Sequence, residues 1–266
     1  MFGLCPSDVA PTVQTKDSFA LQNSRIEREE IMKTAVITGA SRGIGRAMAI
    51  AFADAGYSVI ATYNKDKAAA DEVAKGRDIS FYQLDVSDFN AVNSFAKELL
   101  KTRSIDVLIN NAGIARQRLF TDVTLDEYRE MMGTNADGVF FVTQAFARDM
   151  IKNHKGSIIN ISSMWGQVGA SCEVDYSMAK AAVIGLTKAL AKELGPSGIT
   201  VNCIAPGVVE TDMVKGLGEE VLKDLADETP LCRNGKPEEI AKLALFLAED
   251  NFITGQIIGQ NGGFVI

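Results

Sequence analysis

The sequence contains a single histidine and no Cys-x-x-Cys pair. The histidine is His154, and the four cysteines, Cys5, Cys172, Cys203 and Cys232, are scattered along the chain. We therefore expect no zinc or other metal site, and a Ser-His-Asp triad would need His154 as its base. His154 lies in the polar segment IKNHKGS, which is typical of a solvated loop. Scattered thiols fit a reducing compartment, so we predict a cytoplasmic protein.

Long apolar runs and an excess of positive charge are also missing. No apolar stretch reaches membrane-spanning length, and residues 1–31 lack the basic start and apolar core of a signal peptide. The formal net charge is −7, so the chain as a whole would repel a nucleic acid or an anionic membrane. We expect neither as a partner.

The chain is long enough for one large globular domain, with 266 residues of which 47% are hydrophobic. Met32 begins a segment that looks like a natural chain start. We therefore expect residues 1–31 to form a poorly ordered extension and residues 32–266 to form the domain.

Short apolar runs alternate with helical periodicities after Met32. Seven runs are typical of strands: 34–38, 58–62, 79–84, 106–110, 157–162, 199–205 and 255–260. Runs that are apolar on both faces fit a parallel sheet covered by helices on each side. Right-handed crossovers between such strands predict a doubly wound α/β fold in a single domain.

A glycine-rich turn follows the first predicted strand and opens a helix. The segment AVITGASRGIG contains Gly39, Gly43 and Gly45. Glycines permit a tight turn and a close approach of the backbone to a pyrophosphate, and a helix N-terminus supplies free N–H groups and partial positive charge. This context predicts a dinucleotide site. The alternative is a glycine-rich turn without a ligand.

Tyr176 and Lys180 lie four residues apart in the amphipathic segment 175–193, so they project from one face of a helix. A phenol with a pKa of about 10 is a poor acid–base group near neutral pH. A neighbouring ammonium stabilises the phenolate and lowers that pKa. We expect the tyrosine to donate a proton to a carbonyl oxygen as hydride arrives. The alternative is a surface tyrosine that neighbours a lysine by accident.

Three motifs occur in order: Thr-Gly-x-x-x-Gly-x-Gly at 38–45, NNAG at 110–113 and Tyr-x-x-x-Lys at 176–180. Together they resemble the short-chain dehydrogenase/reductase family, over about residues 32–266. The resemblance implies a Rossmann-type sheet of seven strands, a nicotinamide cofactor and a carbonyl or alcohol substrate.

The resemblance also implies further catalytic roles. Ser163 lies thirteen residues before Tyr176, which is the family's spacing for the hydroxyl that bonds the substrate oxygen; Ser162 is the weaker candidate. Asn135 matches an asparagine that interrupts a long helix and orients a water leading to Lys180. The alternatives are a turn cap for Ser163 and a helix kink for Asn135.

The glycine turn and the resemblance together imply cofactor contacts along the length of the chain. They are Gly39, Ser41, Arg42, Gly43, Ile44 and Gly45 at the glycine turn, Asn64, Asp85, Val86, Asn111, Ala112 and Gly113 toward the adenosine, and Tyr176, Lys180, Pro206, Gly207, Val209 and Thr211 toward the nicotinamide.

The end of the second strand bears on the choice of nicotinamide cofactor. NAD-binding folds usually place an acid there for the ribose 2′-hydroxyl, but here the strand ends in Tyr63 and Asn64. Arg42 can pair with a 2′-phosphate, helped by Lys65. We predict NADPH; the alternative is that Arg42 is a solvated loop cation.

Several segments, among them VNCIAPGVVETDM and ITGQIIGQNGG, look most like 3-oxoacyl-(acyl carrier protein) reductases. This implies reduction of a 3-oxoacyl thioester in fatty acid synthesis, under a mobile flap at 208–233. Acyl carrier protein is acidic, and the arginines expected near the entrance fall, by ungapped counting, on His154 and Ser197. Those docking cations are therefore missing, although Lys152 and Lys155 can substitute.

The string WG…GASCEV…YS is similar to reductases of the 5-aminopentanone modification on elongation factor P. A cationic amine would favour the acids Glu173 and Asp175. The alternative is that both acids face solvent at a helix N-terminus, with Asp175 as the N-cap. A further hypothesis is a non-catalytic NADPH-binding sensor or scaffold, which the intact catalytic set argues against.

Members of the family commonly form tetramers through helices that match 136–152 and 176–194. We expect a homotetramer, with candidate apolar contacts at Phe140, Phe141, Phe146, Ile184, Leu186 and Leu190.

Overall fold

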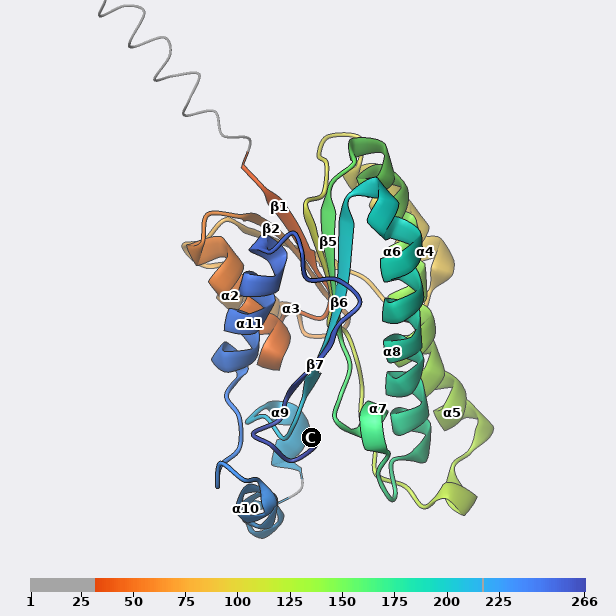
Figure 1. The fold of residues 1–266 in the computed structure, drawn as a ribbon, viewed down its shortest axis with the longest axis vertical. Helices are drawn as coiled ribbons and strands as arrows, with labels where there is room; N and C mark the ends of the chain where they lie inside the picture. Colours follow the sequence, from red (N-terminus) through yellow and green to blue (C-terminus); the bar gives the residue numbers. More distant parts are fainter. Residues whose placement is uncertain (1–31, 217) are drawn as a thin grey trace, which may run out of the picture. The chain divides into compact units, whose positions relative to one another are not determined.

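Seven parallel strands form one sheet in a computed structural model that describes residues 32–216 and 218–266 (Figure 1). The strands are β1 (Thr34–Ile37), β2 (Ser58–Tyr63), β3 (Ile79–Gln83), β4 (Val107–Asn110), β5 (Gly156–Ile161), β6 (Ile199–Pro206) and β7 (Ile257–Gln260), in the order β3-β2-β1-β4-β5-β6-β7. The doubly wound fold is confirmed, and the predicted strand ends shift by at most two residues. The predicted disorder of 1–31 lies outside the described residues.

Helices cover both faces of this sheet (Figure 1). One face carries α2 (Gly43–Asp54), α3 (Lys67–Ala74) and α11 (Pro237–Glu249), and the other carries α4 (Phe89–Leu99), α6 (Gly138–Asn153) and α8 (Val174–Leu194). Each layer has its own apolar cluster, with Phe52 and Leu247 in the first and Phe146 and Met150 in the second. Lys33–Ile266 forms one compact unit.

The central strands contribute to both clusters. In β1, Ala35 and Ile37 pack into the first cluster while Val36 packs into the second. In β4, Ile109 and Leu108 divide in the same way. Successive side chains of a strand point to opposite faces, so a strand buried on both faces is apolar throughout. This is why the strands appear in the sequence as continuous apolar runs.

Shorter elements follow the carboxyl ends of the strands: the 3-10 turn η1 (Phe120–Asp122), α5 (Leu125–Met132), the π-helical turn η2 (Gly133–Asp137), α7 (Trp165–Val168), α9 (Asp212–Lys215) and α10 (Glu219–Glu228). The predicted flap contains α9 and α10. β1 pairs with β2 on one side and β4 on the other, so the connections leaving β1 and β4 diverge and open a crevice. Within the part of the chain that the structure describes, no helix is long and apolar enough to cross a membrane.

Candidate functional site

The glycine turn and the NNAG motif form one unit at this crevice. Gly39 has a left-handed backbone with φ of 66°, and a β-carbon there would lie 2.8 Å from Ala112 Cα. Asn111 Nδ2 donates to the carbonyl oxygens of Thr38 and Gly39 at 2.9 and 3.0 Å. A β-carbon on Gly45 would collide with the Gly39 carbonyl and the Asn111 amide. Only glycine fits at this packing of turn against strand end.

The first turn of α2 leaves backbone N–H groups that could bind an anion. Its N-cap, Arg42, makes no side-chain cap bond, so no side chain of the cap occupies the N–H groups that a helix N-terminus presents. Ser41 and Ile44 are half-buried beside it. A β-carbon on Gly43 would lie 3.3 Å from Thr211 Cγ2, so the turn meets the segment after β6. The arrangement fits a pyrophosphate group.

The end of β2 lies against the same turn. Ala40 N–H donates to the Thr62 carbonyl at 2.8 Å, and Arg42, Asn64 and Lys65 are exposed on this side. Hydrogen bonds from Ser87, followed by one from Asn64, lower the pKa of Asp85 against a partial effect of burial. Val86 is buried under the start of α6, where a β-carbon on Gly138 would lie 2.7 Å from Val86 Cγ2.

The four predicted catalytic residues come from three segments and converge. Ser163 follows β5, Tyr176 and Lys180 lie in the first two turns of α8, and Asn135 lies in η2. All four are buried. Lys180 Nζ lies 5.7 Å from the centre of the Tyr176 ring. A β-carbon on Gly113 would lie 2.8 Å from Asn135 Oδ1 and 3.4 Å from Lys180 Nζ, so both groups gather around this glycine.

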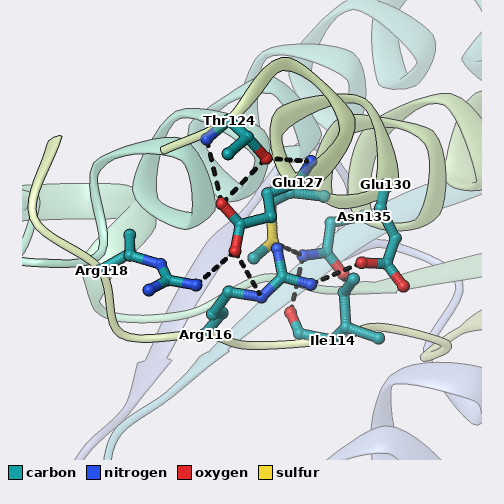
Figure 2. A network of polar contacts seen from close by, with 8 residues as sticks. Ile114, Arg116, Arg118, Thr124, Glu127, Glu130 and Asn135 are labelled. Atoms are coloured by element: carbon teal, nitrogen blue, oxygen red, sulfur yellow. Dashed lines mark hydrogen bonds and ion pairs between the residues drawn. The ribbon is translucent and has the colours of Figure 1, made fainter. Parts of the chain in front are cut away.

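Asn135 is held by backbone on both sides of its amide. Its Oδ1 accepts from Ile114 N at 2.9 Å, and its Nδ2 donates to Ile114 O at 2.8 Å (Figure 2). Nδ2 also lies 2.8 Å from Met131 Sδ. The π-helical turn interrupts the run from α5 to α6 at this residue, as the sequence predicts.

Ser163 and Tyr176 are hydrogen-bonded to each other. Trp165 N–H donates to Ser163 Oγ at 3.1 Å, which occupies one of the two lone pairs of the hydroxyl oxygen. Ser162 points elsewhere, donating to the Lys180 carbonyl at 2.8 Å. Of the two serines, only Ser163 faces the tyrosine.

The pKa values correct one expectation. Burial raises the pKa of Tyr176 to about 12; the Ser163 hydrogen bond opposes this and the negative Glu173 adds to it. Burial lowers the pKa of Lys180 to about 8. The sequence analysis expected the ammonium to lower the phenol pKa, but among the protein's own groups burial dominates. Lys180 Nζ donates to the Ile161 carbonyl at 2.9 Å, which uses one of the three N–H groups of the ammonium.

The predicted nicotinamide side lies next to Ser163. Met164 N–H donates to the Pro206 carbonyl at 2.9 Å, and Gly207 N–H donates to Gln260 O at 3.1 Å. A β-carbon on Gly207 would lie 2.8 Å from Asn261 Cα. Val209 is buried, and Thr211 Oγ1 donates to its carbonyl at 3.3 Å.

The expected docking positions are misplaced. His154 and Ser197 lie two residues before the starts of β5 and β6, and a β-carbon on Gly198 would lie 2.8 Å from His154 O. Both therefore lie at the amino ends of parallel strands, whereas Ser163 follows a carboxyl end. The expectation that they flank the entrance is wrong within this chain. Lys155 is paired with Asp106 at 2.7 Å, and His154 is exposed as predicted.

The two acids near Tyr176 do not both face solvent. The N-cap of α8 is Glu173, so Asp175 lies inside the first turn, where it is buried. Glu173 is half-buried; burial raises its pKa, a hydrogen bond from Gln117 opposes this, and Asp175 adds to it. The helix begins one residue before the predicted start, which turns Asp175 inward.

Sequence reasoning missed a buried chain of polar side chains beneath the site. Asn110 Nδ2 donates to Thr143 Oγ1 and to Asn160 Oδ1, both at 2.8 Å, and Asn160 Nδ2 donates to Thr187 Oγ1 at 2.9 Å. The chain joins α6, β4, β5 and α8. Its signal was present as asparagines inside the apolar runs DVLIN and SIINIS.

Known proteins match nearly the whole described chain. The sequence matches a family described as enoyl-(acyl carrier protein) reductase over residues 39–265. The 3-oxoacyl-(acyl-carrier-protein) reductase FabG of Chlamydia trachomatis is 43% identical over 241 residues, which are 88% of this chain and 97% of that protein. The acetoacetyl-CoA reductase of Rhizobium meliloti is 44% identical over 237 residues, 87% of this chain and 98% of that protein.

A solved structure is also similar to this chain over most of its length. The structure assigned as an NAD(P)-dependent gluconate 5-dehydrogenase of Beutenbergia cavernae, with NADP bound at low occupancy, has a TM-score of 0.83 and 36% identity, over 87% of this chain and 96% of that chain.

Proposed function

Because the chain belongs to the short-chain dehydrogenase/reductase family, we propose that it reduces the 3-oxo group of an acyl thioester to a 3-hydroxyl group with NADPH, as in fatty acid synthesis. The names of two relatives, a 3-oxoacyl-(acyl-carrier-protein) reductase and an acetoacetyl-CoA reductase, support this substrate class. The observation that carries the proposal is the gathering of Asn135 and Lys180 around Gly113, beside the bonded pair Ser163 and Tyr176.

The residues present fit a nicotinamide dinucleotide. The close packing at Gly39 and Gly45 and the start of α2 would receive the pyrophosphate. Arg42 and Lys65 are exposed beside the end of β2, which has no acid to repel a 2′-phosphate. This supports NADPH over NADH. When bound, the reduced nicotinamide supplies a hydride.

Tyr176 would hold the proton that the reaction consumes. With its pKa raised to about 12, the phenol is protonated at neutral pH and can donate to the carbonyl oxygen while the carbonyl carbon receives the hydride. Ser163 would donate a hydrogen bond from its hydroxyl to the same oxygen, while its own oxygen accepts from Trp165 N–H. The product is a secondary alcohol and a phenolate.

Lys180 would return a proton to the phenolate. Its pKa of about 8 lies close to neutral pH, so it can both hold and release a proton there. Once the phenolate forms, its negative charge favours the ammonium form of the lysine. Asn135, which lies beside Lys180 at Gly113, is the next polar group along this route.

A panel of carbonyl substrates tests the proposal. We expect rapid NADPH oxidation with acetoacetyl-CoA and longer 3-oxoacyl thioesters, and much slower oxidation of NADH. Arg42→Ala should narrow the difference between the two cofactors by raising the KM for NADPH alone. Absence of thioester turnover, or a clear preference for NADH, would contradict the proposal. Any turnover also excludes the sensor or scaffold hypothesis.

One observation favours a second candidate, reduction of the 5-aminopentanone modification on elongation factor P. The carboxyl groups of the half-buried Glu173 and the buried Asp175 lie next to Tyr176 in the chain, and negative groups there suit a substrate amine. Glu173→Gln should then slow reduction of the aminoketone by a larger factor than reduction of acetoacetyl-CoA. Equal effects on both substrates would remove this candidate.

We also propose a homotetramer that uses the faces of α6 and α8. Phe140 is 48% exposed on α6 and packs edge-on against Phe141, which contacts Phe89. Phe146, another candidate, is fully buried in the core, so it cannot contact a second copy. The half-buried candidates are Ile184, Leu186 and Leu190.

A further inference from the structure

The segment from Gly113 to Arg118, which follows β4, contacts several parts of the site. At its start, Gly113 meets Asn135 and Lys180, and Ile114 bonds both ends of the Asn135 amide. At its other end, Arg118 N–H donates to the Cys172 carbonyl at 2.7 Å. The position of this short segment therefore sets two parts of the site relative to each other.

Its second anchor is the turn that leads into α8. Gln117 is hydrogen-bonded to Glu173, the N-cap of the helix that carries Tyr176. Cys172, whose carbonyl receives Arg118 N–H, has a left-handed backbone with φ of 61°. Such a conformation is unfavourable for a non-glycine residue and persists where neighbouring contacts hold it.

Glu127 of α5 holds this segment from outside the site (Figure 2). Its Oε1 accepts from Arg118 Nη2 at 2.6 Å and lies 4.0 Å from Arg116 Nε. Its Oε2 accepts from Thr124 N and Thr124 Oγ1, both at 3.0 Å. Arg116 also pairs with Glu130 of the same helix. The carboxylate thus joins the helix start to the loop.

The Glu127 carboxylate is more shielded than the groups of an exposed ion pair. The Glu127 side chain is 19% exposed and that of its partner Arg118 is 48% exposed, whereas the side chains of Lys67 and Asp71 on α3 are 69% and 59% exposed. A shielded, multiply bonded carboxylate fixes its partners more strongly than a solvated one. Bonds from Thr124 and Arg118 lower the pKa of Glu127 to about 2, so the carboxylate stays charged at working pH.

Helix geometry carries the restraint to Asn135. Glu127, Met131 and Asn135 lie four residues apart, and residues at this spacing share one helix face. Glu127 bonds Arg118, while Met131 Sδ and the Ile114 backbone receive Asn135 Nδ2. Residues on one face of α5 and η2 therefore bond both ends of the segment: Asn135 bonds Ile114, and Glu127 bonds Arg118.

We propose that Glu127 is a positioning residue for the reaction: through Arg118 it fixes the segment that orients Asn135 at one end and the turn ahead of Tyr176 at the other. It touches neither substrate nor cofactor in this role. The inference rests on the proposed reductase function, because its effect on rate needs a reaction to measure.

The first test removes each half of the pair. Glu127→Gln and Arg118→Gln should each lower kcat for acetoacetyl-CoA reduction by about tenfold or more, since small misplacements at a reacting site are costly. The KM for NADPH should change by less than about twofold, because the glycine turn is untouched. The double variant should be no slower than the slower single variant, and Arg118→Lys should recover part of the rate.

Asp71→Asn is the matched control. It removes the charge of a carboxylate that is ion-paired with Lys67 on α3, where both side chains are exposed. It should leave kcat within about twofold of the wild type, because an exposed ion pair contributes little and this one touches no part of the segment from Gly113 to Arg118. A normal kcat in both glutamine variants, or an equal fall in Asp71→Asn, would overturn the proposal.

Amide hydrogen exchange provides a readout that does not depend on turnover. In Glu127→Gln and Arg118→Gln, the amides of Ile114 and Arg118 should exchange faster, because their acceptors are Asn135 Oδ1 and Cys172 O. Unchanged exchange at both amides would refute the restraint itself. If the wild-type protein reduced no carbonyl substrate, the proposed function would be wrong. The exchange rates of the two amides would still show whether Glu127 and Arg118 restrain the segment.

Discussion

Tyr176 and Lys180 show how burial sets the chemistry of single residues. The same apolar surroundings raise the pKa of the phenol to about 12 and lower that of the ammonium to about 8, because burial penalises whichever form is charged. The spacing of the two residues was visible in the sequence. The direction of the tyrosine pKa was not, because it depends on burial that only the packed fold creates.

The buried lysine gives stability a defined pH dependence. The pKa of Lys180 is 10.5 in its reference state and about 8 in the fold. Between these values the unfolded chain binds more protons, so the free energy of unfolding rises with pH, by roughly 3 kcal/mol over the full interval. Tyr176 acts oppositely, but only above about pH 10, where the unfolded phenol loses its proton first.

Denaturant unfolding of the wild type and Lys180→Met between about pH 8 and pH 9.5 measures this effect. We expect the free energy of unfolding of the wild type to increase relative to that of the methionine variant as pH rises, because only the wild type carries the lysine. A constant difference between the two proteins over this interval would show that Lys180 keeps an ordinary pKa in the fold.

At the scale of elements, the turn that joins β1 to α2 is packed too tightly to accept an added β-carbon at Gly45. A β-carbon on Gly45 would meet the Gly39 carbonyl and the Asn111 amide. Gly45→Ala should therefore push the glycine turn away from the NNAG segment and weaken NADPH binding by more than about tenfold, since it alters the surface a pyrophosphate must approach. Fluorescence titration with NADPH measures the affinity.

Gly185 offers the matched control for that substitution. It lies in α8 with no atom within 4 Å of an added β-carbon. Gly185→Ala should leave NADPH affinity unchanged and raise stability by about 0.5–1 kcal/mol, because alanine favours a helix interior. Normal NADPH affinity in Gly45→Ala would mean that the crowding at this turn has no bearing on the cofactor.

The sequence predicted best those elements that are buried on both faces. The strands stood out because a parallel strand covered on both faces is apolar at every position, as Ala35, Val36 and Ile37 show. The start of α8 was misplaced because its N-cap, Glu173, makes no side-chain cap bond. His154 and Ser197 were assigned to the entrance by counting along the chain, which ignores the direction in which β5 and β6 run.

At the scale of the whole molecule, Phe140 on α6 offers a test of the proposed tetramer. Phe140 is 48% exposed while its neighbour Phe141 is half-buried. If α6 packs against a second copy, Phe140→Asp should place a charge in that contact and lower the mass measured by light scattering from a tetramer to a smaller species. A wild-type monomer, or a tetramer unaffected by the substitution, would contradict this arrangement.

The account depends on Tyr176 as the proton donor, and one variant tests this directly. Steady-state NADPH oxidation with acetoacetyl-CoA should be slower by about 10²–10⁴-fold in Tyr176→Phe, while titration shows NADPH affinity within about twofold of the wild type. The substitution keeps the buried ring and removes only its hydroxyl, which is hydrogen-bonded to Ser163. A near-normal kcat in this variant would contradict the proposed mechanism.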